Sequence, residues 1–266
     1  MDLRDQVTNH NEKGEIMSIP ITRFIPIIAI GLLTAQPGRA ADTTIEQMPA
    51  KLETQFALSA APPQLRDKAT VYLLDPKTGY HLSKQGTSGV ACVVARTVWE
   101  WADFRNDIYI PLCYDAVGTK AHLKVILDTA TLRAQSMNPG ALKVEVEKRY
   151  KDKTYNVPEK AGVSYMIAPL MRETGPPDMK VRTMSMPHLM FYAPGITNED
   201  IGAVPNLNNH TSLLYPFIDK QGNAEQSYII QLIGAAEKAK ILATEKRLIA
   251  DLCAYRKVLC LTKTHH

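Results

Sequence analysis

Long apolar segments, catalytic signature motifs and an excess of charge of one sign are all missing from this chain of 266 residues. The longest apolar run, residues 24–33, is shorter than the roughly 20 residues that a membrane-spanning helix needs. Lys and Arg total 31 against 27 Asp and Glu, a net charge of +4 without a basic stripe. This balance argues against a nucleic-acid partner.

Motifs that would assign a reaction or a cofactor are missing as well. The chain has no G-x-S-x-G, S-x-x-K, H-E-x-x-H, G-x-x-x-x-G-K or G-x-G-x-x-G. It has no C-x-x-C and no Cys/His grouping at metal-ligand spacing, so we expect neither a metal nor a cofactor. These absences argue against several enzyme classes without excluding an enzyme.

What the chain does have is an export signal near its front. Arg23 precedes the apolar run, and Gly38 and Ala40 are small residues at the −3 and −1 positions of a cut after Ala40. This pattern predicts a cleaved secretory signal peptide within residues 1–40, with an uncleaved tether as the alternative. The acidic residues before Met17 do not suit a signal peptide, so we expect translation to start at Met17. The mature protein is then periplasmic or secreted and has no membrane attachment.

The four cysteines all lie in the predicted mature part, where an even number favours disulfides. Cys92 and Cys113 lie in two strand-like runs and can pair, closing a loop of about 20 residues that stabilises the fold by roughly 3 kcal/mol. Cys253 and Cys260 lie in one helical pattern, in which seven residues span roughly 10 Å, too far for a disulfide. They pair only if the helix breaks near residues 256–257, and buried free thiols are the alternative.

Residues 41–266 have the length of one domain, and their mixed order of strand and helix patterns predicts the α+β class. We expect an antiparallel sheet with helices packed mainly on one face. Predicted strands cover residues 70–75, 80–84, 89–95, 108–114, 163–168, 188–193 and 228–233, and predicted helices cover 42–61, 121–135 and 141–151. The strands at 70–75 and 80–84 are expected to form a hairpin around the turn 75–79, and Asn138-Pro139 to begin the helix over 141–151. Residues 172–178 read as a loop, and Thr197 as the cap of a helix.

The longest predicted helix is the last one, over residues 235–259. Its apolar stripe includes Ile241, Leu248, Leu252 and Leu259. Residues 235–260 form a possible C-terminal helical extension of the domain, and the stripe is a candidate dimer seam.

A histidine and a tyrosine on one predicted strand form the main candidate site. Side chains alternate along a strand, so His188, Met190 and Tyr192 share one face. Asp200 follows at the predicted helix start, and the three polar side chains are candidates for general acid–base catalysis. The alternative is structural: His188 ends a strand, Tyr192 packs, and Asn198 and Asp200 tie a turn.

Other aromatic and polar residues receive simpler interpretations. Tyr165 and Asn198 are candidate ligand-binding residues. Trp99 and Trp101 are either an exposed aromatic contact or a cover over the core, and the area that Trp buries favours the core. His122 is expected to be solvated on the surface of a helix.

Residues 187–194 read P-H-L-M-F-Y-A-P and residues 197–202 read T-N-E-D-I-G. With residues 57–62, 89–92, 113–115 and 165–166, this segment resembles a family of uncharacterised exported bacterial proteins that share a P-H-x-M-F-Y-A-P…T-N-x-D-I-G segment. The resemblance covers most of the mature chain up to about residue 230. It implies export and a shared fold, and it implies no activity.

Two functions remain open at this point. The first is an exported protein that binds an unidentified small molecule or protein partner. The second is a periplasmic hydrolase-like enzyme that uses His188 as a general base, oriented by Tyr192 or Asp200. An open pocket around His188, with an acid or hydroxyl within hydrogen-bond reach, would distinguish the enzyme.

Overall fold

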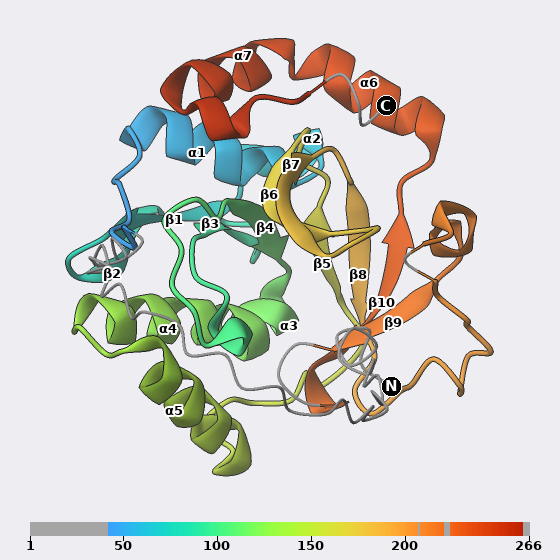
Figure 1. The fold of residues 1–266 in the computed structure, drawn as a ribbon, viewed down its shortest axis with the longest axis horizontal. Coiled ribbons are helices and arrows are strands. Elements are labelled where there is room, and N and C mark those ends of the chain that lie inside the picture. The colour runs from blue at the N-terminus through green and yellow to red at the C-terminus, as the bar shows by residue number, and fades with distance from the viewer. Residues whose placement is uncertain (1–41, 207, 221–223, 263–266) are drawn as a thin grey trace, which may run out of the picture.

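The computed structural model describes residues 42–206, 208–220 and 224–262 (Figure 1). The predicted signal peptide and the proposed start at Met17 lie outside these residues. The strands are β1 (Thr70–Asp75), β2 (Gly79–Lys84), β3 (Ala91–Ala95), β4 (Ile110–Tyr114), β5 (Val163–Met166), β6 (Met171–Gly175), β7 (Lys180–Met184), β8 (His188–Tyr192), β9 (Phe217–Lys220) and β10 (Ser227–Leu232). The main helices are α1 (Ala50–Ser59), α2 (Pro63–Arg66), α3 (Ala116–Gly118), α4 (Lys124–Ala134), α5 (Pro139–Lys151), α6 (Ala235–Thr244) and α7 (Lys246–Tyr255).

The larger sheet is mixed, so the prediction of an antiparallel sheet is wrong. Its strand order is β2-β1-β3-β4-β5-β8-β10-β9, and β1 and β3 run parallel while the other neighbours are antiparallel. β2 lies at the edge of the sheet and β3 lies on the other side of β1. The chain therefore reverses direction after β1 and again after β2, so that β3 runs parallel to β1. Gly86 permits this return, because a Cβ there would lie 2.2 Å from the carbonyl oxygen of Lys68.

Helices cover both faces of this sheet, which corrects the prediction of one covered face. On one face, Phe56 of α1 and Leu252 of α7 pack with Val94 and other residues of β1, β3 and β4. On the other face, Val93 and Leu112 pack with residues at the start of α4. All residues of β3 and β4 are buried, and a strand that is buried on both faces needs a layer on each side.

A second, two-stranded sheet forms where the sequence predicted a loop. Strands β6 and β7 pair from Met171↔Met184 to Gly175↔Lys180. Residues 176–179, Pro-Pro-Asp-Met, lie between them and form the turn of a hairpin, which the loop interpretation did not recognise. Met171 and Met184 are buried against the larger sheet, so this β6–β7 hairpin covers part of its surface. Figure 1 shows the hairpin in front of β5.

The prediction of one long C-terminal helix is also wrong, because this segment forms two helices, α6 and α7, that meet at Glu245. Helix α7 ends at Tyr255, and the backbone is extended at Arg256. This end of the helix allows Cys253 and Cys260 to come together as a disulfide. Leu252 and Leu259 are fully buried in the core beneath α7. These two residues of the predicted dimer interface therefore pack within the core of this chain.

Several local predictions are confirmed. β1 and β2 form the expected hairpin, and α5 begins after Asn138, whose side chain accepts a hydrogen bond from the N–H of Ala141 at 2.9 Å. Cys92 and Cys113 lie opposite each other on β3 and β4 and are joined by a disulfide. Within the described residues, no helix has both the length and the apolar character to cross a bilayer.

Candidate ligand-binding site

A pocket of about 210 Å³ lies on the face of the sheet that α4 covers. Its floor comes from β4, β5, β8, β9 and β10, and its walls come from α4, the β6–β7 hairpin and the short 3₁₀ helix Trp99–Trp101. Aromatic rings and thioethers dominate the lining. The rings are Trp99, Trp101, Tyr114, Tyr150 and Phe217, and the thioethers are Met166, Met171, Met179, Met186 and Met190.

His122 is the most unusual polar group of this pocket. It is only 3% exposed, so the expectation of a solvated histidine is wrong. Asp115 caps α3, which places the helix start before residue 121, and a π-helical turn at Thr119–Leu123 follows. A π-turn rotates the side chains relative to a regular helix, and here it directs His122 inward.

Three tyrosine rings surround the His122 imidazole. Its ring centroid lies 5.8 Å from Tyr114, 5.0 Å from Tyr192 and 4.6 Å from Tyr228. The Nε2 atom is buried and has no hydrogen-bond partner among the described residues. Burial lowers the pKa of His122 from 6.5 to about 3, against an opposing effect of Asp115, so the ring is neutral at physiological pH. His122, with a neutral ring and an unpartnered nitrogen, thus lines the pocket.

His188 lines the same pocket at the opposite end of β8 from Tyr192. Its Nδ1 atom lies 2.7 Å from the carbonyl oxygen of Met186. A carbonyl only accepts, so Nδ1 carries the proton and Nε2 keeps its lone pair in the neutral ring. Burial lowers the pKa of His188, and the bond to Met186 opposes this shift only in part.

Tyr192 shares the face of His188, as strand alternation predicts, but it bonds elsewhere. Its hydroxyl donates to Oδ1 of Asp115 at 3.0 Å. The same carboxylate accepts from the N–H groups of Val117 and Gly118, while Oδ2 accepts from Val163. Tyr192 and Asp115 therefore join the start of α3 to β5.

The remaining candidates from the sequence also have other partners. Asp200 is exposed and binds the N–H and hydroxyl of Thr197 at 2.8 and 2.7 Å, and this segment forms a turn instead of the predicted helix. Asn198 exchanges hydrogen bonds with the backbone of Ile218. Tyr165 packs against the opposite face of the sheet. The hydrogen bonds thus connect His188, Tyr192 and Asp200 to separate partners, not to one another.

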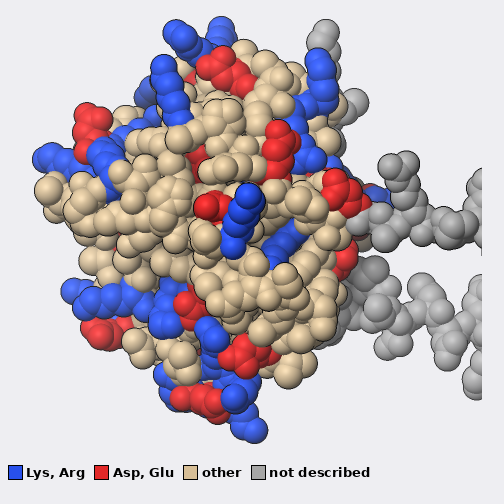
Figure 2. Space-filling view, turned by 90° about the vertical axis from the view of Figure 1, so that its left-hand side faces the viewer, with Lys and Arg blue, Asp and Glu red and all other residues tan. Residues whose placement is uncertain are grey.

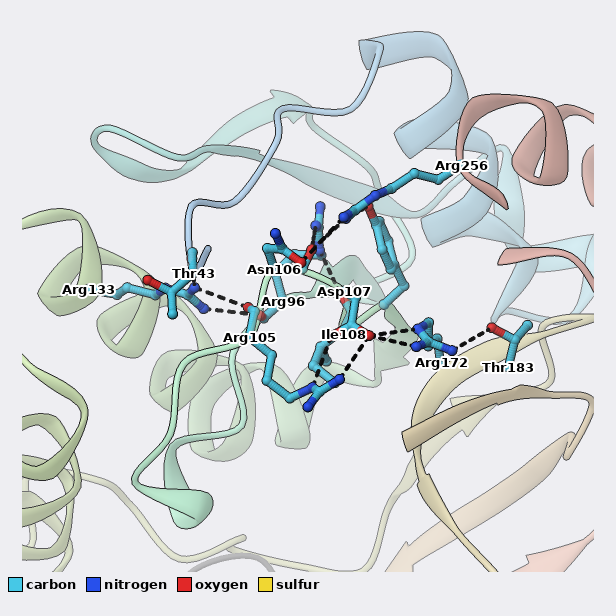
Figure 3. Close-up of polar contacts among 11 residues, drawn as sticks. Thr43, Arg96, Arg105, Asn106, Asp107, Ile108, Arg133, Arg172, Thr183 and Arg256 are labelled. Carbon is cyan, nitrogen blue, oxygen red and sulfur yellow. Dashed lines mark hydrogen bonds and ion pairs between the residues drawn. The ribbon is translucent and has the colours of Figure 1, made fainter. Parts of the chain in front are cut away.

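Arginine side chains hold the loop that carries the two tryptophans (Figure 3). Arg133 of α4 donates to Oγ1 of Thr97 and to the carbonyl oxygen of Arg105, both at 3.0 Å. Arg96 donates to the carbonyl oxygen of Ile108 at 2.6 Å. These bonds fix both sides of the Trp99–Trp101 turn to β3, β4 and α4.

A second group of arginines holds the same loop from the other direction. Arg105 and Arg172 both bind the carboxylate of Asp107, at 2.9 and 2.6 Å. Arg256, just after α7, donates to the carbonyl oxygen of Asn106 at 2.6 Å. The arginines of both groups come from α4, from the loop itself, from β6 and from the segment after α7. Their hydrogen bonds and ion pairs hold the loop with Trp99 and Trp101 in place at the pocket.

The outer surface offers a less distinctive site. On the face shown in Figure 2, charges of both signs are interspersed. Several pair between neighbouring helices: Asp128 of α4 binds Lys124 at 2.8 Å and Arg149 of α5 at 2.9 Å. Such partly exposed pairs contribute little individually. They stabilise packing and do not mark a binding site.

Sequence reasoning missed the pocket because its walls come from segments far apart in the chain. Of the five candidate residues, only His188 lines it. The pairing of Trp99 and Trp101 around Glu100 was the available signal, since all three line the pocket and Trp99 is 7% exposed. In the described residues, no group of three His, Cys, Asp or Glu side chains could hold a metal ion. The chain matches no protein-family model, no curated protein and no solved structure in the comparisons made, and the family resemblance stays a prediction.

Proposed function

We propose that this is an exported protein that binds an apolar small molecule in the pocket between the sheet, α4 and the β6–β7 hairpin. The observation that carries this proposal is the buried, unpartnered Nε2 atom of His122, a residue that lines a pocket rich in aromatic rings and thioethers. A buried polar atom without a partner costs about 1–3 kcal/mol. A ligand hydroxyl at this position would remove that cost.

The dimensions of the pocket fit a ring-sized ligand. An apolar cavity of about 150 Å³ admits benzene, and this pocket measures about 210 Å³. Both tryptophans of the chain line it, so intrinsic fluorescence reports on the pocket without a background from other sites. Phenol and toluene are suitable probes because they have the same ring and nearly the same size, and phenol carries a hydroxyl where toluene carries a methyl group.

The test compares the two probes on the parent protein and on His122→Phe. We expect both probes to change tryptophan emission in the parent. We expect His122→Phe to reduce the preference for phenol over toluene by roughly 2–10-fold, the value of one net hydrogen bond of 0.5–1.5 kcal/mol. His81→Phe, the same substitution at an exposed position of β2, is the matched control and should leave the preference unchanged.

Two results would contradict the proposal. Unchanged emission of the parent at millimolar concentrations of both probes would show that the pocket does not bind such ligands. An equal loss of preference in His81→Phe would show that the imidazole of His122 is not the polar partner.

Export is the second part of the proposal. It is supported by the signal-like pattern around Arg23 to Ala40 and by two disulfides, which persist in oxidising compartments. N-terminal sequencing of the exported protein should begin at Ala41. A protein retained in the cytoplasm with its full N-terminus would contradict this assignment.

A further inference from the structure

Methionine is concentrated in one place in this molecule. Five of the ten methionines of the chain line the pocket. Thioethers fill irregular apolar gaps, and they are also soft donors that select Cu(I) among the first-row metals. A site for such an ion needs a further donor with a lone pair close to the sulfurs.

His188 supplies this donor beside two of these methionines. Met166 lies directly opposite His188 in the β5–β8 register, and Met190 lies two residues along β8 on the same face. Directly opposite residues have Cβ atoms about 4.5–5.5 Å apart, within reach of a long, flexible side chain. All three residues are buried and line the pocket.

The hydrogen bond of His188 prepares the imidazole for a metal. Nδ1 donates to the carbonyl oxygen of Met186, which fixes the tautomer and leaves the lone pair on Nε2. Metal-binding histidines commonly donate their second nitrogen to a carbonyl or carboxylate in this way. Met186 itself lines the pocket and is a further thioether near the ring.

The charges around this cluster suit a cation. Glu100, Glu173 and Asp219 line the pocket, and the described lining residues include no Lys or Arg. Neutral donors leave the charge of a bound ion uncompensated, and carboxylates in the same pocket give it a negative surrounding that reduces the cost of burying the ion. All four cysteines are in disulfides, so no thiol competes for a soft ion.

We infer that His188, Met166 and Met190 form a binding site for one Cu(I) ion. The site uses the end of β8 opposite to Tyr192, the strand residue that packs against His122, and His188 and Tyr192 lie about 13 Å apart along the strand at 3.3 Å per residue. It therefore does not rest on the proposed small-molecule site, and either can fail alone.

The test titrates the full protein with Cu(I) under anaerobic conditions against bicinchoninate, a Cu(I) chelator. We expect one equivalent to be withdrawn from the chelator, with a change in tryptophan emission. The double variant Met166→Leu/Met190→Leu should bind Cu(I) at least about tenfold more weakly. It should remain folded, because Leu and Met have similar volumes and such swaps are well tolerated.

The controls separate this site from unspecific binding. Met48→Leu changes a methionine that is equally buried, 3% exposed, in the core on the opposite face of the sheet, and it should bind Cu(I) like the parent. His188→Gln tests the imidazole donor and should also weaken binding at least tenfold. Parent-like binding by the folded Met166→Leu/Met190→Leu variant, or no withdrawal of Cu(I) by the parent, would overturn the inference.

Discussion

Replacing His122 with phenylalanine should stabilise this protein while removing one polar group of its pocket. The imidazole is 3% exposed and its Nε2 atom has no partner, so the folded state leaves a polar atom buried without a hydrogen bond. A phenyl ring keeps the contacts with the three surrounding tyrosine rings and has no such atom. From the cost of an unsatisfied buried group, we expect a gain of about 1 kcal/mol at pH 7.5.

The gain should increase as the pH falls. The imidazole of His122 protonates near pH 6.5 in an unfolded chain and only near pH 3 in the folded protein, because burial disfavours the charged ring. Its neutral form is therefore favourable to folding above pH 6.5, and stability is lost progressively between pH 6.5 and about 3. Each pH unit in this interval costs about 1.4 kcal/mol, so the parent loses about 2 kcal/mol by pH 5 from this residue.

Urea denaturation of the parent and of His122→Phe at pH 7.5, 6.0 and 5.0 measures this effect. The difference in unfolding free energy isolates His122, since other titrating groups are common to both proteins. We expect the advantage of the variant to increase by about 2 kcal/mol from pH 7.5 to 5.0. A variant that is less stable than the parent at pH 5.0, or an advantage that does not change with pH, would refute the reasoning.

Two further predictions concern other buried contacts. Burial raises the pKa of Glu53 from 4.5 to about 7, although the N–H of Leu74 donates to it, so this carboxyl favours folding at low pH and the contribution is lost as the pH rises through 7. Glu53→Gln should therefore gain about 3 kcal/mol relative to the parent between pH 4.5 and 8, measured by urea denaturation at both pH values, and a constant difference would contradict this. Gly118→Ala should destabilise by about 1–3 kcal/mol, because its Cβ would lie 1.9 Å from the Tyr192 hydroxyl oxygen. Gly140→Ala, in the first turn of α5, where the added Cβ would make an ordinary contact of 3.6 Å with Oδ1 of Asn138, should not lower the melting temperature.

The sequence by itself determined the elements whose signals are local. The hairpin of β1 and β2, the cap of α5 at Asn138, and the shared face of His188, Met190 and Tyr192 all depend on residues within a few positions of one another. Side-chain alternation along a strand and capping at a helix start are properties of the adjacent backbone. Such features are therefore predictable from the printed sequence.

Tertiary structure decided the features that depend on distant segments. The parallel pairing of β1 with β3 follows from the position of β2 at the edge of the sheet. At the break between α6 and α7, Glu245 forms an ion pair of 2.6 Å with Arg66, a residue far away in the sequence. The sequence of the β6–β7 hairpin has the composition of a loop, and its strands are stabilised by the packing of Met171 and Met184 on the larger sheet.

The pocket itself is the clearest case. His122 looks like a surface histidine in the sequence, and only the packing of Tyr114, Tyr192 and Tyr228 around its ring removes it from water. Burial is a property of the whole assembly of layers, not of a residue and its neighbours in the chain. For that reason the sequence could name His188 as a candidate, while the site around it emerged only when strands, helices and hairpin were brought together.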